Sequence, residues 1–271
     1  MGEYILRTKN LSKKYGVVYA IENINVEIKQ GQIYGLIGLN GAGKSTFMRA
    51  VTGLISLTSG EVELFGKSGV KALRYGRERI GQSIETPAVY PNMTAGQNLE
   101  IQRKIGKVTD KNIIKGILEL VGLGDTEKKK VKDFSLGMRQ RLALAIALIT
   151  KPEFLILDEP VNGLDPVGII EIRELIRRLA KEQGLTFLVS SHLLDELAQV
   201  ATHYGIIDKG RLVKQISQEE LSYESRQYIK IITDNTGKTI SLIKKTLGIP
   251  KLKKPQKMNC TYMVIRKRPG K

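Results

Sequence analysis

The chain has little cysteine and no long apolar run. Its one cysteine, Cys260, excludes an intrachain disulfide and fits a reducing compartment. The longest uncharged apolar run, 142–149, is far shorter than the roughly 20 residues that a membrane-spanning helix needs. Residues 1–4 are not a basic segment followed by an apolar core, so we expect no secretory signal. We therefore expect a cytoplasmic protein without a membrane span.

Acidic residues are also scarce beside basic ones, with 27 Asp and Glu against 44 Lys and Arg, a net charge of +17. Such an excess fits nucleic acid, an anionic membrane surface or simple solubility. Residues 216–271 hold 13 Lys or Arg and 4 Asp or Glu, so +9 of this charge lies there. A basic tail beside a membrane would bind anionic lipid, but a solvated charged surface is the simpler interpretation. The hydrophobic content of 41% argues against wholesale disorder and predicts one or two domains.

The segment Gly38–Thr46 matches the phosphate-binding pattern G-x-x-x-x-G-K-[ST]. The apolar run 33–37 before it predicts a buried strand, and a helix can open after it. Glycines let the backbone wrap around phosphate, and the helix start directs N–H groups at it. We expect Lys44 to reach the β- and γ-phosphates and the Ser45 hydroxyl to bind Mg²⁺. The residues expected to contact the nucleotide in this loop are Gly38, Asn40, Gly41, Ala42, Gly43, Lys44, Ser45 and Thr46.

Two adjacent carboxylates follow a second apolar strand, predicted at 154–157. Asp158 at the strand end is placed to hold Mg²⁺ through water. Glu159 can polarise the water that attacks the γ-phosphate. Paired acids are common in turns, but after a phosphate loop they indicate nucleotide hydrolysis.

The rest of the pattern predicts an α/β domain interrupted by helices. Residues 1–81 are predicted to be mainly strands, with Ile21, Val26 and Ile28 on one side of a short run. Residues 94–149 are predicted to be helical. From residue 153 the pattern becomes strand–helix–strand, which predicts a parallel, mostly buried sheet.

A third motif, Phe134–Leu142, resembles the signature motif of ATP-binding cassette (ABC) ATPases. Ser135 and Gly137 match the family consensus Leu-Ser-Gly-Gly-Gln. A Ser hydroxyl and a Gly N–H at a helix start form an anion site, which in the family closes over ATP held by a partner subunit. The residues that depart from the consensus are Phe134, Leu136 and Met138.

Further segments resemble other motifs of the family, in the family's order. Residues 162–165 resemble the D-loop, and 189–192 resemble the switch-histidine loop, so the resemblance implies that His192 contacts the γ-phosphate and orients water. Tyr15 resembles the aromatic residue that stacks on adenine. Residues 80–88 resemble the Q-loop, but Glu85 stands where the family has glutamine; a carboxylate can also ligand Mg²⁺.

The resemblance covers roughly residues 3–215 and implies the fold. We expect a P-loop NTPase of ABC type, with a Rossmann-like α/β core, an N-terminal antiparallel β subdomain and an inserted helical subdomain at about 86–150. We expect this ATPase domain to span 1–215 and a basic C-terminal extension to span 216–271. Within the extension, the segments expected to form a strand, a helix and a strand are 227–233, 238–247 and 260–266.

The resemblance also implies an ATPase whose ATP sites are shared. Lys44, Glu159 and His192 would act catalytically on ATP with Mg²⁺, while Ser135 and Gly137 would complete the site of a head-to-tail homodimer. With no span of its own, the chain would act at the inner face of the cell membrane through a separate permease, docked near 85–91. Glu85, the altered signature and the basic extension resemble the bacitracin-resistance and lantibiotic-immunity branch of exporters.

Two rival functions are open on the sequence. The charge motivates a soluble ABC ATPase acting on ribosomes or nucleic acid, although we expect no nucleic-acid partner. Ribosome-type members resemble two fused cassettes and DNA-repair members carry long coiled-coil inserts, and this chain shows neither. A non-catalytic nucleotide sensor is disfavoured because the whole hydrolytic set is present.

Overall fold

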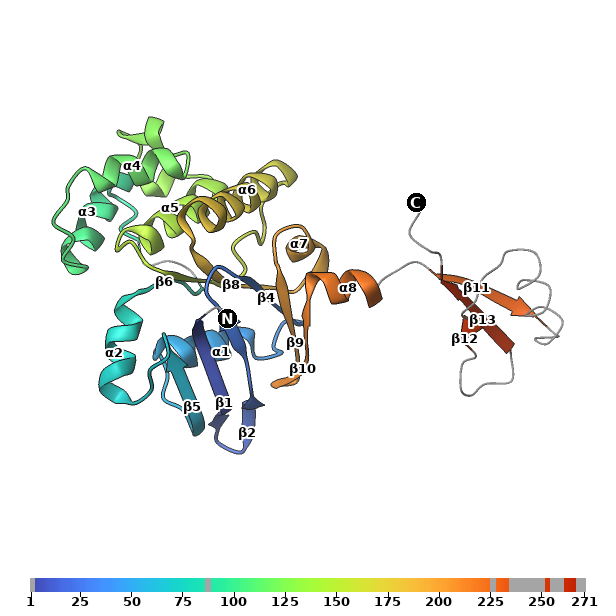
Figure 1. The fold of residues 1–271 in the computed structure, drawn as a ribbon. Coiled ribbons are helices and arrows are strands. Elements are labelled where there is room, and N and C mark those ends of the chain that lie inside the picture. The colour runs from blue at the N-terminus through green and yellow to red at the C-terminus, as the bar shows by residue number, and fades with distance from the viewer. Residues whose placement is uncertain (1–2, 86–88, 225–227, 234–251, 254–260, 267–271) are drawn as a thin grey trace. The chain divides into compact units, whose positions relative to one another are not determined.

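The computed structural model describes residues 3–85, 89–224, 228–233, 252–253 and 261–266 (Figure 1). These belong to two compact units, Met1–Gln218 and Glu219–Lys271, which are described separately. Among the described residues no helix is both long enough and apolar enough to cross a lipid bilayer.

An antiparallel sheet opens the first unit. Its central strand pairs with three others, so that segments on both sides of the phosphate loop join one sheet. The expectation for Ile21, Val26 and Ile28 is confirmed, because all three are buried. The strands of this sheet are β1 (Tyr4–Tyr15), β2 (Val18–Ile24), β3 (Glu27–Lys29) and β5 (Ser59–Leu64).

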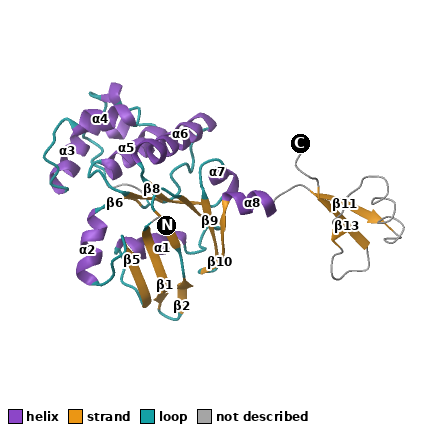
Figure 2. Ribbon diagram, in the orientation of Figure 1, coloured by secondary structure: helices purple, strands orange, loops and turns teal. Residues whose placement is uncertain are grey.

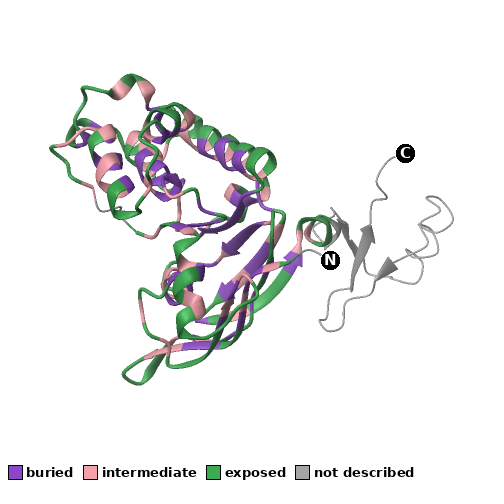
Figure 3. Cartoon of the chain, turned by 60° about the vertical axis from the view of Figure 1, so that its left-hand side comes forward, coloured by how far each residue is buried: buried purple, intermediate pink, exposed green. Residues whose placement is uncertain are grey.

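A six-stranded sheet forms the centre of the first unit, in the order β10-β9-β4-β8-β7-β6. All neighbours run parallel except β10 and β9, which confirms the predicted parallel sheet. Strands β7 and β8 are buried at every position, as parallel strands covered on both faces must be (Figure 3). The strands are β4 (Ile33–Ile37), β6 (Ile80–Ser83), β7 (Phe154–Leu157), β8 (Thr186–Ser191), β9 (His203–Asp208) and β10 (Arg211–Ser217).

Helices cover both faces of this sheet (Figure 2). Helix α1 lies between it and the antiparallel sheet, where Phe47, Met48 and Val51 enter one core with residues of β1, β2 and β4. Helices α3 to α6 lie together on the other face. The helices, with two short 3₁₀ turns, are α1 (Lys44–Thr52), α2 (Val70–Glu78), α3 (Ala95–Ile105), α4 (Ile113–Leu120), η1 (Gly124–Thr126), η2 (Val131–Asp133), α5 (Leu136–Leu148), α6 (Pro166–Gln183), α7 (Leu194–Ala198) and α8 (Gln218–Glu224).

Local sequence signals explain where two of these helices begin. Thr94 accepts a hydrogen bond from the backbone of Gln97, whose side chain accepts one from Thr94 N, so a capping box starts α3. Asp165 accepts from Gly168 N at the start of α6, and Pro166 occupies its first turn. Helix α6 then runs to Gly184, which adopts the left-handed conformation that ends it.

Besides the residues of α8 that belong to it, the described part of the second unit is a small antiparallel sheet in the order β11-β13-β12. Two of its strands coincide with those expected at 227–233 and 260–266. The helix expected at 238–247 lies outside the described residues. The strands are β11 (Tyr228–Thr233), β12 (Leu252–Lys253) and β13 (Thr261–Arg266).

Candidate nucleotide-binding site

Three of the predicted motifs follow adjacent parallel strands and therefore meet at one edge of the sheet. The phosphate loop follows β4, Asp158 follows β7 and His192 follows β8. The pairings Ile37–Ser191 and Leu157–Val189 bring the ends of these strands level. In open α/β sheets this carboxyl edge is where ligands bind.

The phosphate loop leaves the start of α1 open to an anion. Gly43 caps the helix at φ +107°, and a Cβ there would lie 2.7 Å from the carbonyl oxygen of Ala20. Glycine is needed here for both reasons. Along the described chain no side chain caps α1 at this end, and its first turn holds no acidic residue. Its first N–H groups, with the positive end of the helix dipole, thus fit a phosphate.

Lys44 carries a buried ammonium group held by three oxygens. The residue is 5% exposed, and its Nζ donates to the carbonyls of Gly38 at 2.7 Å and Leu39 at 3.3 Å. Its third partner is Glu159 Oε1, at 3.1 Å. A buried charge needs such partners, and the carboxylate supplies the only full negative charge among these three.

Glu159 connects this ammonium group to the switch histidine. Its second oxygen, Oε2, lies 3.0 Å from Nδ1 of His192. Glu159 adopts φ +47°, a left-handed conformation that is unfavourable for a residue with a side chain and is found at functional sites. The structure thus brings the three expected catalytic residues, Lys44, Glu159 and His192, into one continuous cluster.

Ser190 hydrogen-bonds to both acidic residues, Asp158 and Glu159, although we predicted no role for it from the sequence. It is fully buried on β8, and its hydroxyl donates to Asp158 Oδ1 while accepting from the backbone N–H of Glu159 at 2.9 Å. Ser190 lies within the segment 189–192 that resembles the switch-histidine loop, and this place in the sequence was the signal that could have indicated its role. Ser45, in the first turn of α1, and Asp158, at the end of β7, are oxygen ligands of the kind that Mg²⁺ prefers.

Glu85 forms an ion pair with Arg49 of α1. It follows β6, on the same edge as the other motifs, and adopts φ +62°. The sequence did not predict this partner, since Arg49 becomes its neighbour only when α1 and β6 pack on one sheet. The metal role expected for Glu85 is neither supported nor opposed by this pair.

Two predicted contact sites lie elsewhere. Tyr15 ends β1 with its ring half-exposed, 5.0 Å from the ammonium group of Lys13. Ser135 caps α5 by accepting from Met138 N, and Gly137 lies in the first turn. No hydrogen bond or ion pair among the described residues joins Ser135 or Gly137 to the Lys44 cluster. In the described residues, the start of α5 is therefore separate from the cluster at the phosphate loop.

Comparison with known proteins gives consistent matches. Residues 21–162 match the family model described as ABC transporter. The chain is 45% identical to the bacitracin transport ATP-binding protein BcrA of Bacillus licheniformis, over 90% of this chain and 80% of that one. It is 44% identical to the lantibiotic transport ATP-binding protein SrtF of Streptococcus pyogenes, over 77% and 89%. It is also similar, at TM-score 0.70 and 26% identity over 79% and 98%, to the dimeric structure of MJ0796, a bacterial ABC transporter cassette.

Ser190→Ala is expected to damage the site through both carboxylate-bearing residues. It leaves the Glu159 N–H without its acceptor and Asp158 without its donor, which should lower the free energy of unfolding by about 1–3 kcal/mol. ATP hydrolysis should fall as well. Urea unfolding and a phosphate-release assay measure these effects.

The matched control is Ser191→Ala, since the Ser191 hydroxyl contacts Glu196 and the backbone of Leu193 instead. A Ser190→Ala protein with parental stability and turnover would show that Ser190 does not organise the carboxylates.

Proposed function

This chain belongs to the ABC transporter family, and we propose that its ATPase activity powers export through a separate membrane permease. The proposed cargo is an antimicrobial peptide or a similar compound, so that the protein confers resistance or immunity. The observation that carries the catalytic part is Glu159, placed between Lys44 and His192 at the strand edge. The relatives named for bacitracin and lantibiotic transport support the exporter part. They do not favour the rival function on ribosomes or nucleic acid.

Lys44 and Glu159 change partners when ATP binds, in the proposed mechanism. Phosphate oxygens at the start of α1 compete with Glu159 for the Lys44 ammonium group, because both are anions within reach of one buried cation. Lys44 then neutralises charge on the β- and γ-phosphates. Glu159, released from the ion pair, can turn toward water.

Glu159 is the proposed general base. Its carboxylate takes a proton from the water whose oxygen attacks the γ-phosphorus, and ADP leaves with the bridging oxygen. His192, 3.0 Å from Glu159 Oε2, holds the carboxylate in place and contacts the γ-phosphate. The left-handed conformation of Glu159 and the hydrogen bond from its backbone N–H to Ser190 fix the backbone position from which its side chain extends.

Ser45, Asp158 and Glu85 are the proposed Mg²⁺ ligands. The first two fit because an octahedral Mg²⁺ takes one or two protein oxygens together with substrate phosphates and waters. A bound Mg²⁺ would neutralise negative charge on the phosphates. Glu85 would have to leave Arg49 in order to take part.

A head-to-tail homodimer is the proposed active species. Ser135 and Gly137 form an anion-binding helix start that is separate from the phosphate loop of their own chain. In a head-to-tail pair, Ser135 and Gly137 of one copy would lie over the γ-phosphate bound at the phosphate loop of the other copy. Tyr15 would stack on the adenine. The dimeric structure of MJ0796 supports a homodimer.

The proposed unit boundaries remain 1–215 for the ATPase, with a helical subdomain at about 86–150, and 216–271 for the extension.

The permease is proposed to dock beside the segment that follows Glu85, which would hold the protein at the inner face of the cell membrane. Tyr90 in this region is 52% exposed, yet its backbone is fixed. Its N–H donates to the buried Asn98, whose amide donates back to the Tyr90 carbonyl. An exposed aromatic ring on a fixed backbone suits a protein contact.

Glu159→Gln should bind ATP and barely hydrolyse it. A neutral amide cannot act as the base, so kcat should fall by about 10²–10⁴-fold. ATP affinity should equal or exceed the parental value, because the amide no longer competes with phosphate for Lys44. Light scattering should then show an ATP-dependent dimer.

Glu153→Gln is the control, since Glu153 precedes the same strand and pairs with Arg79 on the surface. Turnover of Glu159→Gln near the parental rate would refute Glu159 as the base.

Glu85→Gln should alter the Mg²⁺ dependence of turnover while leaving nucleotide affinity near parental. A carboxylate lowers the metal concentration needed for half-maximal rate, and an amide does so less. Titration of the ATPase rate with Mg²⁺ measures this. Arg49→Gln separates the explanations, because it breaks the same ion pair and keeps the carboxylate. An unchanged profile for Glu85→Gln, or the same change in both variants, would refute a metal role.

A tagged full-length chain, purified from detergent-solubilised membranes of its own cells, should carry a polytopic membrane protein with it. Tyr90→Ala should reduce this recovery several-fold by removing the exposed ring. Tyr75→Ala, which removes a ring 68% exposed on α2, should leave it unchanged. Recovery of RNA or DNA in place of a membrane protein would overturn the exporter proposal.

A further inference from the structure

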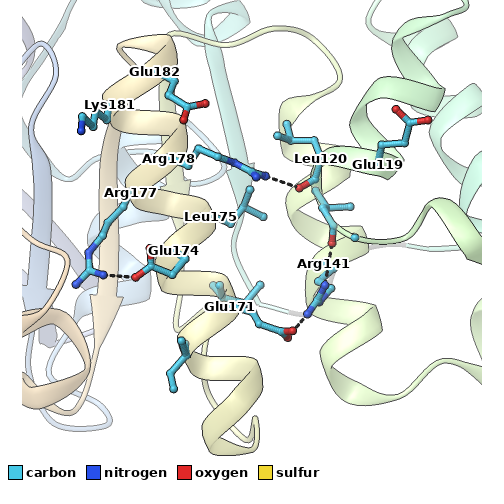
Figure 4. Close-up of a pocket in the computed structure, with 14 residues that line it drawn as sticks. Glu119, Leu120, Arg141, Glu171, Glu174, Leu175, Arg177, Arg178, Lys181 and Glu182 are labelled. Atoms are coloured by element: carbon cyan, nitrogen blue, oxygen red, sulfur yellow. Dashed lines mark hydrogen bonds and ion pairs between the residues drawn. The ribbon is translucent and has the colours of Figure 1, made fainter.

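Helix α6 contacts both the signature helix α5 and the segment that follows the switch histidine. It begins at Asp165, in the D-loop-like segment, and runs along the cavity shown in Figure 4. This cavity of about 780 Å³ has α6 on one side and the end of α4 with part of α5 on the other. Ser135 lies at the start of α5. Side chains that connect α6 with α5 across the cavity therefore influence the orientation of the signature motif.

Two arginines bridge the cavity at the end of α4. Arg178 of α6 donates from Nη2 to the carbonyl of Leu120 at 2.9 Å. Arg141 of α5 donates to the carbonyl of Val121 at 3.2 Å and forms an ion pair with Glu171 of α6. The last carbonyls of a helix lack intrahelical partners and carry the negative end of its dipole, so guanidinium groups suit them.

Gly122 makes this close approach possible. It follows α4 at φ +71°, and a Cβ there would lie 2.4 Å from Nη1 of Arg141. A side chain at this position would therefore displace the guanidinium group from the carbonyl of Val121 as well as strain the backbone. The end of α4 is shaped to receive Arg141.

The first turn of α5 is also in contact with the D-loop-like segment that leads into α6. A Cβ on Gly163 would lie 3.0 Å from Cδ2 of Leu136, and one on Gly137 would lie 3.8 Å from Cδ2 of Leu164. Leu136 is one of the departures from the signature consensus, and in this chain it packs on the D-loop-like segment. Contacts thus recur from this segment along α6 to Arg178.

The opposite side of α6 reaches the helix that follows the switch histidine. Arg177 donates from Nε to the carbonyl of Gln199 at 3.0 Å, and Arg173 donates to the carbonyl of Asp195 at 3.3 Å. Both acceptors belong to α7 or its end, directly after His192. One rigid helix therefore connects the signature helix to the switch-histidine segment.

We propose that Glu171 and Arg178 form a two-point brace that sets the orientation of the signature helix α5. They are positioning residues, which act through Arg141 and the end of α4 and touch no nucleotide. The brace rests on the proposed function, since it prepares Ser135 to close over the nucleotide of a second copy. Without it, α4 and α5 would sample other orientations, and closure would have to order them.

The test separates binding at a chain's own phosphate loop from closure. Glu171→Gln and Arg178→Gln are placed in the Glu159→Gln background. Fluorescent ADP measures nucleotide binding at a chain's own phosphate loop, and light scattering with ATP measures the dimer dissociation constant. ADP affinity should stay within about twofold of the background, while the dimer dissociation constant should rise by about 5- to 20-fold, as expected for the loss of a hydrogen bond to a charged group.

Matched controls line the same cavity. Glu174→Gln makes the charge change of Glu171→Gln, but Glu174 pairs with Arg177 inside α6. Lys181→Gln makes the charge change of Arg178→Gln at the end of the helix. Both should dimerise like the background, and Arg178→Lys should recover most of the loss because it keeps a cation for the Leu120 carbonyl. Parental dimerisation in the brace variants, or an equal loss of ADP affinity, would overturn the brace.

Hydrogen exchange in the nucleotide-free protein tests the brace without relying on dimerisation. The amides of 117–123, at the end of α4, should exchange faster in the two brace variants than in the two controls. If the Glu159→Gln protein formed no ATP dimer, the proposed shared-site function would fail. The hydrogen exchange of 117–123 would still test whether the brace orders the end of α4. Equal exchange in all variants would overturn it.

Discussion

The buried ammonium group of Lys44 is the constraint around which the nucleotide edge is arranged. A cation that is 5% exposed must have negative partners, and two loop carbonyls with Glu159 provide them. In the proposed mechanism a phosphate takes the place of the Glu159 carboxylate beside this cation, since one anion can replace the other. His192 contacts the Glu159 carboxylate, and Ser190 holds the backbone N–H of the same residue. Loop, carboxylates and histidine are therefore parts of one electrostatic arrangement.

The sequence predicted the parts of this arrangement that depend on local order along the chain. Apolar strands followed by Lys44, Asp158 and His192 had to meet once the sheet was parallel, because parallel strands end at the same edge. Helix starts also follow local rules, since a cap such as Asp165 acts on N–H groups within three residues. Helix α4, within the segment 94–149 predicted to be helical, begins at Ile113, after a turn in which Asp110 accepts from Asn112 N.

These local sequence patterns could not predict contacts between segments that are distant along the chain. Ser190 lies in a predicted motif, but its bonds to Asp158 and Glu159 depend on how β7 and β8 pair. The partnership of Arg49 with Glu85 depends on α1 and β6 packing on one sheet. The contacts of α6 with α4, α5 and α7 likewise come from tertiary packing, because each arginine reaches a backbone carbonyl that carries no residue-specific signal.

The separation of Ser135 from the Lys44 cluster on one chain has a genetic consequence. In the proposed head-to-tail pair, each ATP site combines the Lys44 loop of one copy with Ser135 of the other. A copy defective only at Lys44 and a copy defective only at Ser135 would, when mixed, form pairs with one intact site and one site damaged on both sides. Two inactive alleles could thus complement each other in one cell. A single allele carrying both defects would leave no intact site in any pair it enters, and would behave as dominant over the normal copy.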